Sequence, residues 1–448
     1  MVEGIKRKYF FIVLLVACAT RSEAAYSGGN GTGLDPYLLA TAQDLADLTV
    51  DQDNWNRHFR QVADIDMSDL PAPLTSTIGN EELPFSGVFD GDGWTVRNLV
   101  CTNPGGDTAG LFGQVRGSDT RIQNVVMVDP NVEAEGAQYV GIAALVGRLR
   151  SGSVTCCRME GACVRGYSSV GALVGWNQGE ISHCEATGTV SGIYSVGGLV
   201  GTTFWGLDIH HCRADVTVTG VNRVGGLAGN CALASIAWCS SSGNVEGCDY
   251  VGGFVGSSEG GILSNCYAIG SVSGTARVGG LLGQNSWSCD CSAGAYPSEL
   301  RCCYAVGLVT GESQTGGLVG ADDHCLVFGC FWNVETSGQE HSETGTPSTT
   351  IEMQTQKTFL NANWDFTPKT DSLDFWVIQE GRWYPLPAWQ IVEGDFNRDG
   401  IVNLDDFATL TPLWRAKARS FWEGGIDLNG DAGIDARDLG ERFRRWLW

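Results

Sequence analysis

The stretch SVGGLVGTT, residues 195–203, places three glycines within five residues of an apolar run. Close copies recur as VGALVG from Val170, VGGLAG from Val224, VGGFVG from Val251, VGGLLG from Val278 and TGGLVG from Thr315. Through the central copies the last glycine returns about every 27 residues, which is the signature of a chain built from stacked repeats. The phrase therefore predicts a shape, a solenoid, before it predicts any chemistry.

A second phrase follows each glycine phrase and has the periodicity of a β-strand. In ISHCEATGTVSG, which starts at Ile181, apolar and small residues alternate with polar ones. We expect a mainly β protein, a β-solenoid whose coils of about 27 residues hold two or three short strands and stack at ~4.8 Å per layer. The glycines would allow tight corners and a close approach of neighbouring backbones.

One cysteine recurs at the same position of successive repeats, so stacked coils would align these residues in a ladder. The ladder cysteines are Cys157, Cys184, Cys212, Cys239, Cys266, Cys303 and Cys330. We favour a column of buried thiols that act as small apolar side chains. Disulfides between coils and a column of metal ligands are the alternatives, although the C-x-x-C pairs typical of zinc sites are missing. Cys289 and Cys291, in the insertion 286–300, are better candidates for a disulfide.

The repeats resemble the GLUG-motif repeats of bacterial secreted and surface proteins. The resemblance covers residues 110–332 and rests on the recurring G-[LF]-[VAL]-G phrase with its downstream Cys/Gly/Val strand. It implies a β-solenoid, a fold often found in adhesin-like or matrix proteins, and it implies no enzymatic activity.

The first residues are typical of an export signal. Basic residues at 6–8 precede the apolar run YFFIVLLVA, and SEA at 22–24 offers a cleavage site. We therefore expect a signal peptide at 1–24 and a secreted protein. The alternative is a lipoprotein anchored through Cys18, because LVAC resembles a lipoprotein box. No later segment is long and apolar enough to suggest a membrane span.

Two flanking segments are expected to cover the ends of the solenoid, because open sheet edges invite aggregation. Residues 25–109 are expected to form an N-terminal cap and the initial coils, with one short helix that Thr41 caps together with Asp44. Residues 333–391 are rich in aromatic side chains and are expected to form a C-terminal cap. Burial against the last coil is the favoured role of these aromatic residues, and stacking on sugars is the alternative.

The C-terminal residues 392–448 carry the sharpest chemical signal. Two loops there alternate oxygen-bearing side chains, and such loops supply the six to eight oxygens that Ca²⁺ requires. The expected ligands are Asp395, Asn397, Asp399, the Ile401 carbonyl, Asn403 and Asp406 in the first loop, and Asp427, Asn429, Asp431, the Gly433 carbonyl, Asp435 and Asp438 in the second. Each loop leads into an apolar-periodic segment, so we expect a small all-α calcium-binding domain.

The two loops resemble a type I dockerin module, with Asp in place of Glu at position 12. The resemblance covers residues 394–448 and implies calcium-dependent binding to a cohesin-like partner. The second loop departs from the pattern, because Ala432 stands where the bend calls for glycine. Leu404-Asp405 and Ala436-Arg437 replace the Ser-Thr-like pairs that contact cohesins in cellulose-degrading complexes, so the partner need not be a cellulosomal cohesin. The alternative is that calcium only folds the module.

Carboxylates are scattered across the repeats, whereas polysaccharide hydrolases need carboxylates that converge on the scissile bond. ADDHC at 321–325 is the only local cluster, and its Asp322 and Asp323 lie on an expected turn. His183 and His211 share the position before the ladder cysteine and are expected to point outward, one above the other. A two-histidine metal site is the alternative to a solvated surface pair.

The overall charge narrows the choice of partner. A formal net charge of -23 disfavours nucleic acid and anionic membrane surfaces. Together the patterns predict a secreted, non-catalytic, adhesin-like β-solenoid that contacts extracellular polysaccharide or matrix and attaches to a cohesin-like protein through a dockerin. The alternative is a polysaccharide-active enzyme of β-helix type, a hydrolase or lyase, tethered by the same module.

Overall fold

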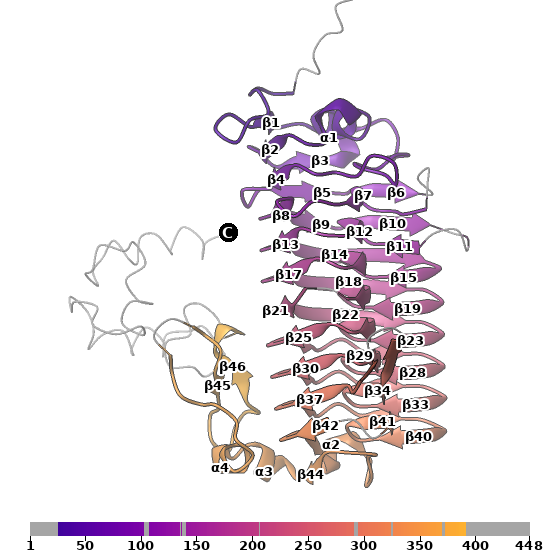
Figure 1. Ribbon diagram of the computed structural model, residues 1–448, viewed down its shortest axis with the longest axis vertical. Coiled ribbons are helices and arrows are strands. Elements are labelled where there is room, and N and C mark those ends of the chain that lie inside the picture. Colours follow the sequence, from indigo (N-terminus) through magenta and orange to yellow (C-terminus); the bar gives the residue numbers. More distant parts are fainter. Residues whose placement is uncertain are drawn as a thin grey trace, which may run out of the picture.

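Four parallel sheets form the sides of one stack of coils in the computed structural model (Figure 1). The structure describes residues 26–102, 107–134, 136, 140–205, 207–290, 294–323, 326–369 and 372–390. Each central coil visits the sheets, named C, A, B and D, in that order, as in β16 (Val174–Asn177), β17 (Glu180–Ser182), β18 (Glu185–Ser191) and β19 (Tyr194–Gly197). The chain is a β-solenoid of about nine turns, as the repeat period predicts. The expected signal peptide and both calcium loops lie outside the described residues.

Each coil contributes at most one strand to sheet A and one to sheet C. Sheet A consists of β1 (Tyr37–Leu39), β2 (His58–Gln61), β4 (Val88–Asp90), β8 (Arg121–Gln123), β13 (Ser153–Thr155), β17, β21 (Ile209–His210), β25 (Ser235–Ala237), β30 (Ile262–Ser264), β37 (Glu299–Arg301) and β42 (Leu326–Phe328). Sheet C consists of β7 (Phe112–Val115), β12 (Val146–Leu149), β16, β20 (Val200–Phe204), β24 (Ala228–Ala232), β29 (Val255–Glu259), β34 (Leu282–Ser286) and β41 (Val319–Asp322).

Sheets B and D complete the coils. Sheet B consists of β3 (Ile65–Asp66), β5 (Thr95–Arg97), β9 (Val126–Val128), β14 (Arg158–Gly166), β18, β22 (Arg213–Thr219), β26 (Ser240–Ser241), β31 (Tyr267–Ala268), β38 (Tyr304–Ala305), β43 (Phe331–Asn333) and β44 (Thr346–Ser348), with β6 (Val100–Thr102), β10 (Asn131–Ala134), β27 (Val245–Glu246), β32 (Val272–Ser273) and β39 (Val309–Thr310) beside this path. Sheet D consists of β11 (Val140–Ile142), β15 (Ser168–Val170), β19, β23 (Asn222–Gly225), β28 (Asp249–Gly252), β33 (Ala276–Gly279) and β40 (Ser313–Gly316).

The coils hold more strands than the two or three expected from the sequence, because the glycine phrase itself forms strands. β19 ends at Gly197 and β20 begins at Val200, so the phrase joins sheet D to sheet C. Glycine normally weakens a strand, and the pattern therefore predicts only a corner there. Crowding of the backbone explains why these strands contain glycine. A Cβ on Gly256 would lie 2.5 Å from the backbone nitrogen of Val224 and 2.6 Å from the carbonyl oxygen of Gly229.

The cysteine ladder lies in the core, as the buried-thiol interpretation predicts. All seven ladder side chains are at most 1% exposed, and their thiols are free. Each thiol also donates a hydrogen bond to the carbonyl two residues before it, as from Cys184 Sγ to the Ser182 oxygen at 3.2 Å and from Cys239 Sγ to the Ala237 oxygen at 3.2 Å. The residue between them is left-handed, with φ of 54° at His183 and 55° at Trp238. The thiol thus fills a small apolar space and satisfies a carbonyl at a sharp corner.

The N-terminal end of the stack has the predicted helix. α1 (Ala42–Leu48) begins after Thr41, whose hydroxyl accepts from the Asp44 backbone while the Asp44 carboxylate accepts from the Thr41 backbone. The helix caps the first coils (Figure 1), and short 3₁₀ segments follow at η1 (Gln52–Asn54) and η2 (Met67–Asp69). β1, β2 and β4 pair in parallel with one another and with β8, so the solenoid extends back into residues 25–109.

The C-terminal segment first covers the end of the stack and then turns back along its flank (Figure 1). It contains β44, the helices α2 (Val334–Ser337), α3 (Thr350–Met353) and α4 (Gln356–Leu360), the antiparallel pair β45 (Trp376–Val377) and β46 (Leu386–Pro387), and η3 (Ala388–Gln390). A second hairpin, β35 (Ser288–Asp290) with β36 (Gly294–Tyr296), occupies the predicted insertion. None of the helices in the described residues is long and apolar enough to cross a membrane.

Residues 333–390 therefore act as a strap across several coils as well as a cap on the last one. The Trp364 indole donates to the Gly329 carbonyl at 2.7 Å, Trp376 to Asn265 Oδ1 at 3.1 Å, and Trp389 to the Trp238 carbonyl at 3.0 Å. Trp364 and Trp376 are 3% and 1% exposed, which confirms burial rather than sugar stacking for these two aromatic residues.

Candidate functional site

The outward face of sheet B is divided into an open half and a covered half. Its pairing aligns one outward column: Thr95, Val126, Arg158, Glu185, Arg213, Ser240, Tyr267, Tyr304 and Phe331. The strap buries the column from Ser240 onward, where Tyr267 and Tyr304 stack with ring centroids 5.0 Å apart. Arg158, Glu185 and Arg213 stay exposed. The open half is the part of the described outward face of sheet B that the strap leaves to solvent.

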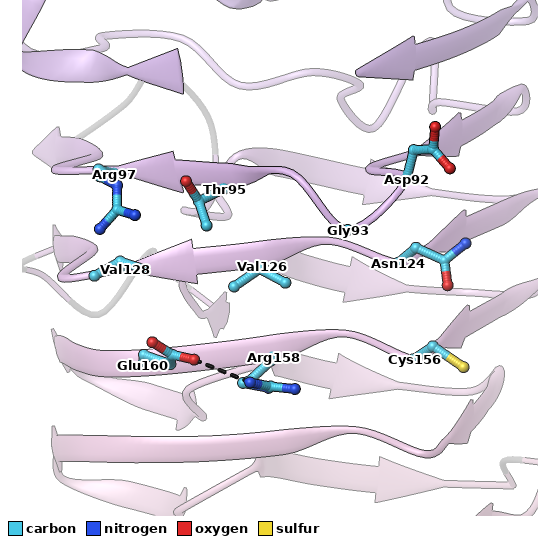
Figure 2. Close-up of a pocket in the computed structure, with 10 residues that line it drawn as sticks. All are labelled: Asp92, Gly93, Thr95, Arg97, Asn124, Val126, Val128, Cys156, Arg158 and Glu160. Carbon is cyan, nitrogen blue, oxygen red and sulfur yellow. Dashed lines mark hydrogen bonds and ion pairs between the residues drawn. The ribbon is translucent and has the colours of Figure 1, made fainter. Parts of the chain in front are cut away.

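A hollow of about 790 Å³ lies on this open half, across three consecutive coils (Figure 2). It is lined by Asp92, Gly93, Thr95, Arg97, Asn124, Val126, Val128, Cys156, Arg158 and Glu160. β5, β9 and β14 supply its floor, where Val126 and Val128 separate the polar groups of the coils above and below. Residues as far apart as Asp92 and Glu160 thus line one surface because the coils stack in register.

The hollow presents both cationic donors and anionic acceptors. Arg158 Nη1 lies 3.3 Å from Glu160 Oε1, and the same guanidinium lies 3.8 Å from Glu185 on the next coil. Figure 2 shows the carboxylates of Asp92 and Glu160 at opposite ends of the hollow, with Arg97 and Arg158 nearer the Glu160 end. An open floor that carries both signs of charge suits an extended polar ligand rather than a small enclosed substrate.

The carboxylates considered for catalysis lie elsewhere, at the edge of the last coil. Asp322 closes β41, and its Oδ1 accepts from Asn285 Nδ2 at 2.9 Å. The Asp323 backbone nitrogen donates to the Asn285 carbonyl at 2.9 Å. Asn285 is fully buried, so this contact extends an interior polar column into the terminal coil. The remaining residues of that cluster, 324 and 325, lie outside the described part of the chain.

The two histidines expected to lie one above the other do so, and a third joins them. His183 and His211 stack with centroids 4.9 Å apart and planes 12° apart. His210 Nδ1 lies 2.9 Å from His211 Nδ1, and one ring nitrogen from each of the three residues lies within 4.8 Å of the others. The sequence already places His210 beside His211, but its convergence with His183 depends on the left-handed corners of both coils.

Two carboxylates hold the outer nitrogens of this cluster. His211 Nε2 lies 2.7 Å from Asp374 Oδ1, on the strap, and His210 Nε2 lies 3.5 Å from Glu180 Oε1. Desolvation lowers the pKa of His183, and the neighbouring His211 lowers it further. Desolvation also lowers the pKa of His211, against the opposing effect of Asp374. Within the described part of the chain, the three imidazoles lie close enough together to hold a metal ion, and Asp374 joins the strap to this group of coil residues.

The calcium ligands expected at 395–438 and the cohesin-binding surface lie outside the described residues, so they stay predictions. The side chains of Cys289 and Cys291 are not described either, and their disulfide also stays a prediction. Cys18 and the export signal also lie outside the described residues, so the lipoprotein anchor and the secretion signal stay predictions.

Comparison with known proteins shows which family the repeats resemble. The family model of the GLUG motif matches residues 166–191 and 247–273. Halomucin from Haloquadratum walsbyi is 31% identical over 194 residues, which are 41% of this chain and 2% of halomucin. A candidate Gly-rich membrane protein from Evansella cellulosilytica is 32% identical over 129 residues, which are 28% of this chain and 14% of that protein. The chain thus spans only a small part of either relative.

A further similarity is to a solved structure. A candidate immunoglobulin A1 protease from Bacteroides ovatus superposes with a TM-score of 0.44 and 19% identity, over 82% of this chain and 96% of that one. The family match and the stacked coils agree with each other and with a surface or extracellular protein. This chain carries GLUG-motif repeats, and they form the coils of a β-solenoid.

Proposed function

We propose that this protein is a secreted, non-catalytic surface protein of adhesin type whose solenoid contacts extracellular polysaccharide or matrix through the open half of sheet B. The observation that carries the proposal is the division of that sheet: the strap covers its aromatic half and leaves the charged half, with the hollow, exposed. Covering the aromatic half limits nonspecific association through an apolar patch.

The stacking of the coils favours a long ligand. Equivalent side chains such as Arg158, Glu185 and Arg213 recur at one strand spacing, about 4.8 Å, so a chain-like ligand lying along the stack meets polar groups at regular intervals. The binding free energies of several weak contacts add on a rigid surface, because the protein side chains need not be ordered again for each contact. This arrangement needs no single deep pocket.

The proposal includes a calcium-dependent attachment. The loops at 395–406 and 427–438 hold Ca²⁺ in a dockerin-like module that binds a cohesin-like partner. The solenoid then projects from the partner with its sheet B face free. Non-catalytic action is supported by the position of Asp322, whose carboxylate accepts a hydrogen bond from a buried asparagine.

Binding of the full-length protein to immobilised polygalacturonate and xylan, measured in calcium by surface plasmon resonance, tests this function. Arg158→Glu should weaken binding at least tenfold, because it reverses the charge in the hollow. Arg382→Glu is the matched control, since Arg382 is exposed on the strap and does not line the hollow. Absence of binding by the wild-type protein, or equal binding by both variants, would contradict the proposed face.

The same polysaccharides test the enzymatic alternative. Release of new reducing ends or unsaturated products by the wild-type protein, abolished by Asp322→Asn and Asp323→Asn, would replace the adhesin proposal with a hydrolase or lyase. Binding without product release is the expected result.

A further inference from the structure

We propose that His183, His210 and His211 bind one Zn²⁺ ion, which fastens the strap to the flank of the solenoid through Asp374. The proposal is independent of the function proposed above. It rests on the geometry of four side chains drawn from two coils and from a segment 163 residues further along the chain.

The hydrogen-bonding capacity of the rings gives the first argument. A carboxylate accepts only, so the contact of 2.7 Å with Asp374 puts the proton of neutral His211 on Nε2. The contact of His210 Nε2 with Glu180 favours the same tautomer in His210. Both Nδ1 atoms then carry lone pairs, yet they face each other at 2.9 Å. Two acceptors at that separation repel unless a proton or a metal cation lies between them.

The separation also suits coordination by zinc. Zinc holds imidazole nitrogens at about 2.0–2.1 Å, which places two ligands of a tetrahedral site about 3.3 Å apart. A small opening of the His210–His211 contact meets this requirement. His183 is exposed, so its ring rotates without repacking the core and brings a third nitrogen to the ion. A water molecule completes the site.

The carboxylates occupy the outer positions typical of such sites. A zinc-bound histidine commonly donates its other N–H to a carboxylate, which fixes the ring and strengthens the ligand. Asp374 and Glu180 have these positions around His211 and His210. The nearest cation on the strap, Lys369, donates to the Asp374 backbone carbonyl and pairs with Asp365, so the Asp374 carboxylate faces the histidine.

At this location the ion would hold one end of the strap against the solenoid. Asp374 precedes the buried Phe375 and Trp376, and Trp389 lies edge-on to His211 with centroids 5.6 Å apart. The histidine cluster is therefore the far end of the strap's contact with the stack, four layers or about 19 Å from Gly329. An ion there holds the end of the strap that the aromatic core does not reach.

Zinc titration of the chelator-treated full-length protein, in excess calcium to occupy the oxygen-rich loops, tests the site. We expect one zinc ion to bind with a Kd in the micromolar range or below. His183→Ala and His210→Ala should each weaken it at least tenfold, and Asp374→Ala, which removes a positioning residue, by about tenfold. His341→Ala is the matched control, because His341 is an exposed histidine outside the cluster and should leave the affinity unchanged.

The exposed thiols Cys156, Cys163 and Cys248 are side chains of a type that also binds zinc, and the histidine variants separate any contribution from them. Circular dichroism confirms that each variant keeps the β-solenoid. Failure of the wild-type protein to bind zinc overturns the proposal. Zinc affinity that is the same in His183→Ala, His210→Ala and His341→Ala overturns it as well.

Discussion

Replacing Gly256 by alanine is predicted to destabilise the solenoid strongly although it adds one methyl group. Gly256 is the last glycine of VGGFVG and lies in β29, between β24 and β34. A Cβ there would lie 2.5 Å from the Val224 nitrogen and 2.6 Å from both the Arg223 carbonyl carbon and the Gly229 oxygen. All three atoms belong to the backbone of residues 223–229, around the glycine phrase of the preceding repeat, so no side-chain rotation relieves the contact.

The expected cost follows from the spacing of the layers. Relief requires a shift approaching 1 Å in a stack whose layers are fixed at about 4.8 Å by hydrogen bonds on both sides. Overpacking alone costs about 1–3 kcal/mol, and each ladder hydrogen bond lost adds about 1 kcal/mol. We therefore expect a loss of about 3 kcal/mol or more, which lowers the midpoint of thermal unfolding by roughly 6–12 °C.

Thermal unfolding followed by circular dichroism measures the shift, with Gly33→Ala as the control. A Cβ on Gly33 meets only the His58 ring, at an ordinary 3.5 Å, so this variant should melt within about 2 °C of the wild-type protein. Equal melting temperatures for Gly256→Ala and Gly33→Ala would refute the claim that close backbone approach explains the glycine phrase.

Three further predictions concern the strap, the ladder and the calcium loops. Trp376→Ala removes a ring that is 1% exposed and hydrogen-bonded to Asn265, so limited proteolysis within 334–390 should accelerate at least tenfold, whereas the exposed Trp383→Ala should leave it unchanged. Burial raises the pKa of the ladder thiols Cys184 and Cys212, so the unfolded chain loses these protons first as the pH rises. Stability should therefore fall above about pH 8.5, by up to about 1.4 kcal/mol per pH unit for each such thiol, and urea melts between about pH 7 and pH 10 check this sign. Calorimetric titration of the full-length protein should show two calcium-binding events, with Asp395→Ala removing one and Asp427→Ala the other; retention of both events in either variant would contradict the ligand assignment.

Local rules predict much of this fold. The period of the glycine phrase predicts the stack, the alternation after Ile181 predicts β18, and Thr41 with Asp44 predicts the cap of α1. The burial of the cysteines follows from their common position in each coil. These features depend on residues that are close in the sequence or on the equivalent residues of the adjacent coil. The sequence pattern is therefore enough to predict them.

Features that depend on contacts between distant segments do not follow from those rules. Strand propensity gives little weight to glycine, so the strands within the phrase were missed. The course of the strap depends on its tryptophans meeting Asn265 and Trp238 over 100 residues away. Asp374 meets His211 for the same reason, and the division of sheet B into open and covered halves follows from the course of the strap.

The distance between labels at positions 194 and 313 tests the stacking of the coils most directly. Tyr194 and Ser313 begin β19 and β40, and the pairing of sheet D places them four layers apart, at about 19 Å. Spin labels attached to unnatural amino acids avoid the native thiols, and pulsed electron paramagnetic resonance measures the separation. One narrow distribution near 20 Å, after allowance for the label linkers, is the predicted result. A broad distribution, or one centred beyond about 30 Å, would contradict a stack with one repeat per coil.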